Sequence, residues 1–394
     1  MQRRAFTARL GASLALPWMG LSARAAAPVT IGMVAPLTSG TAAEVGKQVA
    51  LGVETYFADA QRTQALGADV RVVFEDDDFK PEKTVAGARK LLAAKPAALI
   101  SFATSNTQAL IEAKIPEEHG LPVFPTRSGS QVIREPVNPY VFHVRAGYST
   151  EIAKIVAQMA GAIGITKFAA LYQDDAYGKT GLAALQAALE QRKLKLVASA
   201  PYDRTTSDVQ PALGTLRGVD AQVIVMVAGH KAASAFVQAY KGAGGHAQLV
   251  GISDLDPVKL VQEAGVERAR GVGLTQVFPA LSSQSIPVVR EFHQLMLAAK
   301  KPDSVTSLAT FEGFLVAKAI GQGIRLAAAG RSAAVDGRAL ADALNRTPRI
   351  DLGGYDLSFQ GGRREGSLFT EIAIIDGSGR ARRRARGMGL LLKT

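Results

Sequence analysis

The chain has 394 residues, of which 47% are hydrophobic and 20% charged, and it contains no cysteine. This length allows two domains of ordinary size, and the absence of cysteine excludes disulfides, thiolate catalysis and cysteine zinc sites. The formal net charge of +12 falls to +2 once the basic residues of 1–25 and 380–394 are set aside. A net charge of +2 on the remaining residues does not indicate binding to nucleic acid.

Residues 1–25 have the features of an export signal. Two arginines, Arg3 and Arg4, precede a short apolar run, and Ala23-Arg24-Ala25 matches a small-x-small cleavage site. The apolar run is too short to span a bilayer comfortably, so we expect an exported, periplasmic protein. The arginine pair allows the twin-arginine route, although the residues after it depart from that pattern, and the general secretory route stays open.

From Val29 onward, short apolar runs alternate with longer amphipathic segments. The apolar runs at 29–34, 70–75, 98–102, 122–125, 167–172 and 222–227 predict buried strands. The segments near 43–60, 81–94, 152–163, 178–191 and 231–242 predict helices. A helical stretch over 286–344 and short strands at 349–351, 356–359 and 370–375 complete the chain, with a basic, disordered tail expected at 380–394. Strands alternating with helices predict an α/β protein with doubly wound parallel sheets.

Hydroxyl-rich loops follow two of the predicted strands. Thr104 and Ser105 follow the first, and Thr126, Arg127 and Ser128 end the second. In a parallel sheet both loops lie at the carboxyl edge, where open α/β folds bind ligands. Hydroxyls beside the free N–H groups of a helix start can receive a carboxylate.

Two further polar loops follow strands in the second half of the chain. One contains Tyr177 and the other contains Ser253 and Asp254. Each alone is explained by helix capping, but loops from two lobes facing each other would surround one ligand.

Motifs of catalysis and of cofactor binding are absent from the sequence. No phosphate-binding glycine loop or nucleophile elbow is present, and the five histidines share no metal-ligand spacing. We therefore expect a binding protein rather than an enzyme, without cofactor or metal. A hydrolase is the distant alternative, and it would lose turnover on mutation of a titratable cleft residue.

The stretch Ile31–Gly40 and the strand-end loops, in this order and spacing, resemble the branched-chain amino-acid (Leu/Ile/Val-binding) family of ABC-importer substrate-binding proteins. The resemblance implies two lobes joined by three crossings that close on the ligand by hinge motion. It also implies delivery to a membrane permease by a monomer, without catalysis. The expected division is 26–145 with 278–353 for the first lobe, and 146–277 with 354–379 for the second.

The resemblance also implies roles for individual residues. Thr104 and Ser128 match positions that bind the ligand carboxylate, and the Thr126 carbonyl matches a position that meets the ligand ammonium. Tyr177 matches a tyrosine of the second lobe. Relatives place an acid where this chain has Ser253, with Asp254 adjacent, which puts an α-amino acid ligand in doubt.

Other departures concern the size and charge of the pocket. Val45 and Gly229 stand where leucine binders have aromatic residues, which leaves more room. Arg127 adds a cation beside the carboxylate loop: pointing outward it is a solvated side chain, and pointing inward it favours an aromatic acid, a dicarboxylate or an acidic amino acid.

We therefore expect a periplasmic protein that captures a small carboxylate-bearing ligand, either an amino acid or an aromatic or dicarboxylic acid, for an ABC importer. A sensory module of the same fold, reporting to a membrane receptor, is the alternative.

Overall fold

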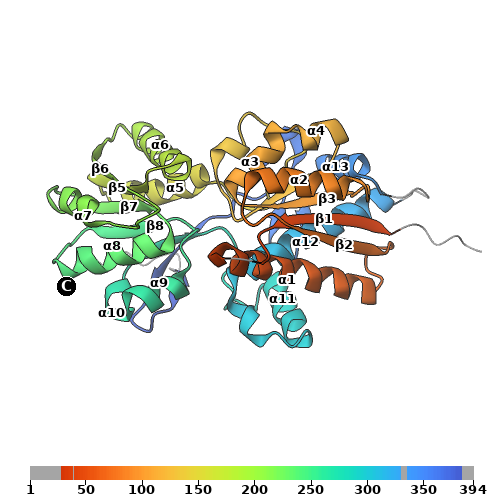
Figure 1. The fold of residues 1–394 in the computed structure, drawn as a ribbon. Helices are drawn as coiled ribbons and strands as arrows, with labels where there is room; N and C mark the ends of the chain where they lie inside the picture. Colours follow the sequence, from red (N-terminus) through yellow and green to blue (C-terminus); the bar gives the residue numbers. More distant parts are fainter. Residues whose placement is uncertain (1–27, 39, 330–334, 384–394) are drawn as a thin grey trace, which may run out of the picture.

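The computed structural model describes residues 28–38, 40–329 and 335–383, in which two α/β lobes lie side by side (Figure 1). The predicted export signal lies outside the described residues. The strands are β1 (Val29–Ala35), β2 (Val70–Asp76), β3 (Ala98–Phe102), β4 (Val123–Thr126), β5 (Phe168–Gln173), β6 (Leu196–Tyr202), β7 (Val223–Val227), β8 (Gln248–Gly251), β9 (Gly273–Gln276), β10 (Ile350–Asp351), β11 (Asp356–Leu357), β12 (Glu371–Ile375) and β13 (Ala381–Arg383).

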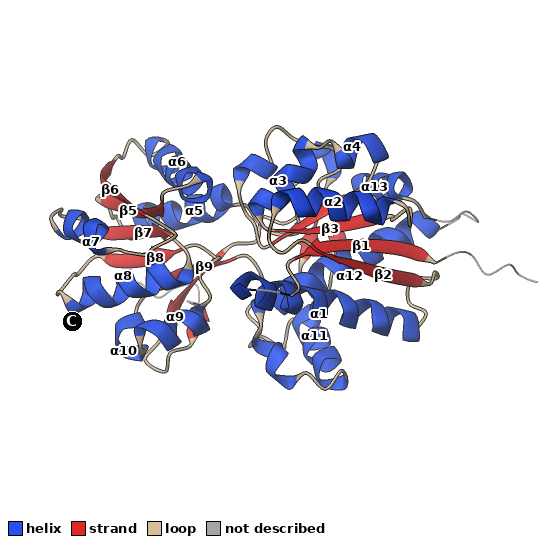
Figure 2. Cartoon of the chain, viewed as in Figure 1, coloured by secondary structure: helices blue, strands red, loops and turns tan. Residues whose placement is uncertain are grey.

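The helices connect these strands and cover both faces of each sheet (Figure 2). The α-helices are α1 (Gly40–Arg62), α2 (Pro81–Leu92), α3 (Thr104–Glu112), α4 (Ile115–His119), α5 (Tyr148–Val156), α6 (Ala176–Glu190), α7 (Gln210–Arg217), α8 (His230–Gly242), α9 (Pro257–Ala264), α10 (Val266–Ala269), α11 (Pro287–Ala298), α12 (Leu308–Ala328) and α13 (Gly337–Arg346). The short 3₁₀ or π segments are η1 (Gln131–Ile133), η2 (Ala157–Ala162), η3 (Pro302–Thr306) and η4 (Gln360–Gly362).

Each lobe is built around one large sheet. Lobe 1 holds the parallel sheet in the order β2-β1-β3-β4, and lobe 2 holds the order β13-β12-β9-β8-β7-β5-β6. The strands β5 to β9 pair in parallel, whereas β12 pairs antiparallel with β9 and β13 antiparallel with β12. The predicted fold of two doubly wound lobes is confirmed, with the antiparallel strands added at one edge.

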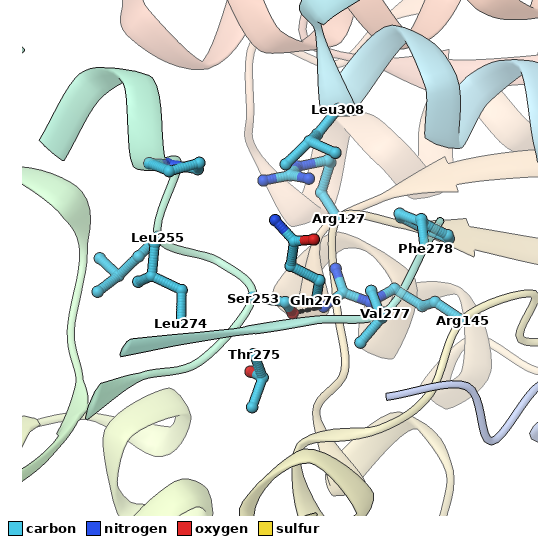
Figure 3. A pocket seen from close by; sticks show the side chains of 11 residues that line it. Arg127, Arg145, Ser253, Leu255, Leu274, Thr275, Gln276, Val277, Phe278 and Leu308 are labelled. Carbon is cyan, nitrogen blue, oxygen red and sulfur yellow. Dashed lines mark hydrogen bonds between the residues drawn. The ribbon is translucent and has the colours of Figure 1, made fainter. Parts of the chain in front are cut away.

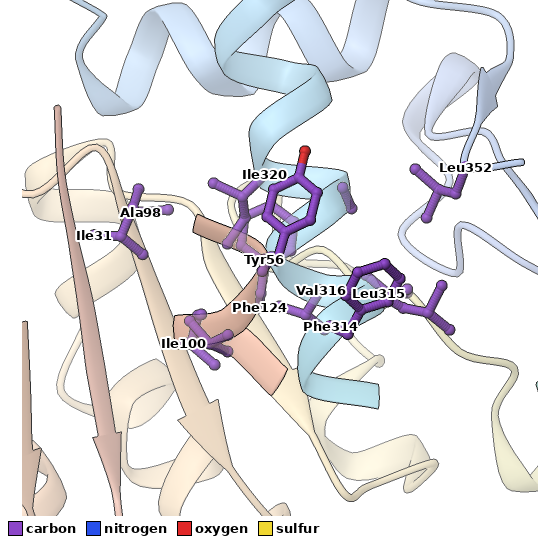
Figure 4. Close-up of a cluster of buried hydrophobic side chains, with 14 of the residues drawn as sticks. Ile31, Tyr56, Ala98, Ile100, Phe124, Phe314, Leu315, Val316, Ile320 and Leu352 are labelled. Carbon is purple, nitrogen blue, oxygen red and sulfur yellow. The ribbon is translucent and has the colours of Figure 1, made fainter. Parts of the chain in front are cut away.

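The main core of lobe 1 lies between its sheet and helices α1, α11 and α12 (Figure 4). Helices α1 and α12 approach so closely that their backbones meet at two glycines. A Cβ atom on Gly52 would lie 2.0 Å from the Thr310 carbonyl oxygen, and one on Gly313 would lie 2.1 Å from that of Val49. Only glycine therefore fits at these two positions.

Three segments connect the lobes. The first runs from β4 to α5, the second from β9 to α11, and the third from β11 to β12. The first and third pair with each other through the bridge between His143 and Glu365. These segments form the hinge region, which keeps the carboxyl ends of the two sheets facing each other.

The structure corrects two predicted boundaries. The second lobe was expected to resume at residue 354, but Tyr355, Leu357 and Phe359 pack in the core of lobe 1, and β11 pairs with β10 there. The tail was expected to be disordered from residue 380, which is wrong for Ala381–Arg383, because these residues pair with β12 as β13. Residues 384–394 lie outside the described residues.

Candidate ligand-binding site

The loops after β3 and β4 bring two hydroxyl groups together in lobe 1. Thr104 Oγ1 and Ser128 Oγ lie 2.7 Å apart, and Ser128 is fully buried. Helix α3 begins at Thr104, and its N-cap residue Ala103 makes no side-chain capping hydrogen bond. The N–H groups of a first turn have no partner within the helix, so this point offers hydroxyls and free N–H donors side by side.

The backbone is strained on both sides of this hydroxyl pair. Ala103 has φ 57° and Arg127 has φ 55°, a left-handed conformation that L-residues with side chains rarely adopt. Such strain costs on the order of 1–3 kcal/mol for each residue and concentrates at functional sites. The two strained residues turn the chain so that both loops present their hydroxyls at the same edge of the sheet.

Two other predicted residues of this edge make structural contacts. Thr126 is fully buried; its Oγ1 donates to the Ser101 carbonyl at 2.8 Å, and its own carbonyl accepts the Ala103 N–H at 2.9 Å. Ser105 is exposed, and its hydroxyl donates to Asn106 Oδ1 at 3.0 Å. Their predicted contacts with ligand remain predictions.

Arg127 is paired within lobe 1. Its backbone N–H donates to Glu312 Oε1 at 2.9 Å, and its Nη1 donates to Glu312 Oε2 at 3.2 Å. The Glu312 side chain is 1% exposed and that of Arg127 is 19% exposed. The guanidinium therefore lies inside the protein rather than in solvent, with its charge already matched by a carboxylate.

Arg145, on the first connection between the lobes, is a functional candidate that sequence reasoning missed. Its guanidinium lies 3.3 Å from Glu151, and its Nη1 lies 3.5 Å from Asp254 and 3.8 Å from Glu312. Burial acts to lower the pKa of Arg145, but the three carboxylates outweigh burial and raise it, so the group stays charged. Arg145 thus joins α12 of lobe 1 to α5 and the loop after β8 in lobe 2.

Glu151 anchors this arrangement from α5. It is fully buried and accepts hydrogen bonds from the Ser253 N–H at 2.8 Å, the Ser253 hydroxyl at 2.8 Å and the Thr275 hydroxyl at 2.5 Å. Burial raises the pKa of Glu151, partly offset by Arg145. Both hydrogen-bond donors of the predicted site residue Ser253 are therefore bonded to Glu151. These bonds fix the position of the adjacent residue Asp254.

We call Arg127, Arg145, Glu151, Asp254 and Glu312 the hinge charge cluster. It holds two guanidiniums and three carboxylates, so it carries one negative charge in excess when every group is ionised. Buried charges are costly unless they are balanced. The cluster is completed by one further positive charge or by one proton.

Two tyrosines stand beside Asp254. Tyr148 Oη donates to Asp254 Oδ2 at 2.5 Å, and the Tyr148 and Tyr177 rings pack edge to face with centroids 5.5 Å apart. Among the described residues, the buried Asp254 Oδ1 and Tyr177 Oη atoms have no hydrogen-bond partner. Tyr177 Oη therefore has an unused hydrogen-bonding capacity, and Asp254 Oδ1 has no contact beyond its 3.5 Å ion pair with Arg145.

Gly229 lies further along the edge of the lobe 2 sheet. Its N–H donates to Tyr202 Oη at 2.8 Å, and Tyr202 Oη donates to Gln173 Oε1 at 2.7 Å. A Cβ atom at Gly229 would come no closer than 3.8 Å to any atom outside its chain neighbours. A small side chain would therefore fit at this position beside the polar groups of Gln173 and Tyr202, and the extra room for a ligand stays a prediction.

A narrow pocket lies between the lobes beside Arg145 (Figure 3). Arg127 and Leu308 border it from lobe 1, Leu255 from lobe 2, and Gln276 from the hinge region. Arg145 Nη1 and Gln276 Oε1 are buried there without hydrogen-bond partners among the described residues. Hinge residues and both lobes therefore meet at this pocket.

Among the described residues, no group of three or more His, Cys, Asp or Glu side chains is placed to hold a metal ion. In the same part of the chain, no helix is long and apolar enough to cross a membrane. The expected absence of cofactor and metal stays a prediction.

Paired lobes, facing strand ends and a polar site between them define a solute-binding protein of the two-lobed class. The family model described as "Periplasmic binding protein" matches residues 28–376, and the chain belongs to this family. The family consists of binding proteins rather than enzymes, and its members are periplasmic or extracytoplasmic.

Similar proteins agree with this assignment. A Brucella melitensis protein described as "Leu/Ile/Val-binding protein homolog 3" is 24% identical over 82% of this chain and 86% of its own length. A substrate-binding periplasmic protein from Ralstonia solanacearum is 31% identical, with a TM-score of 0.80 over 90% of this chain and all of its own. A branched-chain amino acid ABC transporter protein from Thermus thermophilus with bound valine shares the fold, with a TM-score of 0.81 at 18% identity over 91% of this chain and 96% of its own. The predicted family is confirmed.

Proposed function

We propose that this protein binds a zwitterionic amino acid between its lobes in the periplasm and delivers it, as a monomer, to the permease of an ABC importer. Relatives named for Leu/Ile/Val binding and for ABC transport support the transport role. The observation that carries the ligand class is the pairing of a carboxylate receptor in lobe 1 with an excess negative charge at the hinge.

The carboxylate receptor is the Thr104–Ser128 hydroxyl pair at the start of α3. A carboxylate there accepts a hydrogen bond from the hydroxyl whose proton is not donated within the pair, and from the free N–H groups of the first turn. The positive end of the helix dipole adds a favourable term for an anion at this place.

The ammonium receptor is Asp254 with Tyr177. Tyr177 Oη is buried without a hydrogen-bond partner among the described residues, and Asp254 Oδ1 has only its ion pair with Arg145 Nη1 at 3.5 Å, so both atoms can still accept a hydrogen bond. An ammonium group placed there satisfies both atoms and supplies the positive charge that the hinge charge cluster lacks. In this proposal the carboxylate adjacent to Ser253, that of Asp254, takes the role of the acid that relatives place at the Ser253 position.

A dicarboxylate is the less favourable ligand. Its second carboxylate would need a free guanidinium, but Arg127 is paired with Glu312 and Arg145 with three carboxylates. A second negative charge would add to an excess that is already negative, and like charges in a buried place repel strongly.

The test is isothermal titration calorimetry on protein freed of ligand by unfolding and refolding. The panel holds the common amino acids, glutarate and 4-hydroxybenzoate, followed by the deaminated analogue and the carboxamide of the best ligand. We expect at least one amino acid to bind, and removal of its ammonium or carboxylate to weaken binding by about 10- to 100-fold. Binding of glutarate or 4-hydroxybenzoate without any amino acid would overturn the proposed ligand class.

The delivery step is tested separately. The permease and ATPase of an ABC importer are reconstituted in liposomes, and the ligand-loaded protein is expected to stimulate ATP hydrolysis when the importer is its partner. Unchanged hydrolysis, together with binding of the loaded protein to a membrane receptor, would favour the sensory alternative instead.

A further inference from the structure

The topology of lobe 2 places a second polar region at the same edge as Asp254. The sheet order β8-β7-β5-β6 reverses direction between β5 and β7, because the connection after β5 goes to β6 and the one after β6 returns to β7. Ligands of open α/β sheets bind at such a switch point, outside the carboxyl ends of the strands. Gln173 ends β5 and Gly229 follows β7, so these two residues flank the switch point.

Four residues form what we call the polar wall at this point: Gln173, Asp175, Tyr202 and Gly229. Hydrogen bonds run through the wall in one direction, from the Gly229 N–H to Tyr202 Oη, and from the Tyr202 hydroxyl to Gln173 Oε1. Gln173 Nε2 then donates to Asp175 Oδ2 at 2.7 Å. Burial raises the pKa of Tyr202 to about 12, so its hydroxyl keeps its proton and this direction is fixed.

Three residues of the wall, Gln173, Asp175 and Gly229, are only partly buried. A Cβ atom on Gly229 would meet only Gln173 Oε1 and Tyr202 Oη, each at 3.8 Å. A ligand held by its ammonium at Asp254, after β8, and extending along the sheet edge reaches Gly229 after β7 and then Gln173 at the end of β5. The ligand side chain and the wall therefore share one space.

We infer that the wall selects amino acids whose side chain carries a hydrogen-bond donor, such as an amide or a hydroxyl, over branched aliphatic ones. This inference rests on the proposed function. Tyr202 Oη, Gln173 Oε1 and Asp175 Oδ2 each keep a lone pair after their mutual hydrogen bonds, so the wall offers mainly acceptors. A donor on the ligand satisfies them.

An aliphatic side chain would cover these acceptors without a hydrogen bond. A ligand that leaves a polar group of the site unpaired binds much more weakly than a ligand of equal shape that pairs with this group. The absence of an aromatic side chain at Gly229 acts in the same direction, because it removes the apolar surface that an aliphatic ligand needs.

The test compares amino acids of matched shape by isothermal titration calorimetry on the full mature chain. The pairs are asparagine with leucine, threonine with valine, and glutamine with methionine. We expect the polar member of at least one pair to bind about tenfold or more tightly than its partner. Equal or tighter binding of the apolar member in all three pairs overturns the inference while leaving an amino-acid binder. Binding by none of the six also overturns the inference, and the proposed function fails with it only when none of the common amino acids binds.

A matched variant pair checks that the wall is the cause. Tyr202→Phe removes the hydroxyl that links Gly229 to Gln173, and we expect it to reduce the preference within the discriminating pair to about threefold or less. The control, Tyr240→Phe, removes a buried hydroxyl of the same lobe whose partner is the Ala247 N–H, and it should leave the preference unchanged. A preference that survives in Tyr202→Phe would assign selection to another part of the site.

Discussion

Arg127 and Glu312 are joined twice, through the backbone N–H of Arg127 at 2.9 Å and through its guanidinium at 3.2 Å. The backbone contact fixes the strained loop that carries Ser128, and the side-chain contact neutralises the cation nearest to that loop. The carboxylate receptor is therefore formed by hydroxyls and a helix start rather than by a guanidinium. Because Glu312 already pairs with Arg127, the Arg127 guanidinium is not available to bind a ligand carboxylate.

The first prediction concerns Glu312→Gln. Removing this carboxylate breaks its ion pair with Arg127, and we expect this loss to outweigh the relief of the negative excess, because breaking a buried ion pair costs about 3 kcal/mol or more in the free energy of unfolding. Urea unfolding of the ligand-free protein measures this loss. Glu263→Gln, at a half-exposed carboxylate 3.5 Å from His230, is the control and should change the free energy by less than about 1 kcal/mol. Equal losses in the two variants would contradict the importance of the cluster.

The second prediction separates the two serines of the hydroxyl loops. Ser128→Ala removes a buried hydroxyl from the carboxylate receptor, so we expect the ligand affinity to fall about tenfold or more. Ser105→Ala removes an exposed hydroxyl that donates to its neighbour Asn106, and we expect it to lower the affinity less than Ser128→Ala does. Calorimetric titration with the best amino acid gives both values. A larger loss in Ser105→Ala would place the receptor elsewhere along α3.

The sequence was sufficient to predict that Thr104 and Ser128 lie close together, whereas their contact with a ligand stays a prediction. Thr104 and Ser128 follow apolar runs that are visible in the sequence, and parallel topology brings strand ends to one edge. The hinge charge cluster was not predictable in this way. Arg145, Glu151 and Glu312 come from separate elements and meet only through the arrangement of the lobes. The sequence around a single charged residue in an apolar helix does not indicate which distant residue will pair with it.

Two strands that lack an apolar run, β6 and β13, were not predicted from the sequence. Strand β6 (Leu196–Tyr202) is an edge strand with alternating exposure and contains Pro201, which an edge position tolerates. Strand β13 is formed by Ala381, Arg382 and Arg383, whose composition resembles a solvated tail. In both cases pairing with an existing strand, rather than intrinsic preference, produces the structure.

The third prediction tests the close contact between α1 and α12. Gly313→Ala places a methyl group 2.1 Å from the Val49 carbonyl oxygen, so the helices must separate, and we expect a loss of about 2 kcal/mol or more in the free energy of unfolding. Gly214→Ala, within α7, meets no atom within 4 Å and should stabilise the protein by up to about 1 kcal/mol, because alanine favours the helix. Thermal unfolding of both variants should therefore shift in opposite directions. A shift in the same direction would mean that α12 can move without cost.

The fourth prediction follows from the burial of Glu151, which raises its pKa above the ordinary value of 4.5. The folded protein then holds this proton to higher pH than the unfolded chain, so its stabilising contribution is complete below about pH 4.5 and is lost as the pH rises through the folded pKa. Glu151→Gln cannot ionise at this position. The unfolding free energy of the wild type minus that of Glu151→Gln should therefore decrease with rising pH, as measured by urea unfolding at about pH 4 to 8. A constant or increasing difference would mean that Arg145 and the hydroxyls of Ser253 and Thr275 offset burial completely, leaving the cluster with its full negative excess.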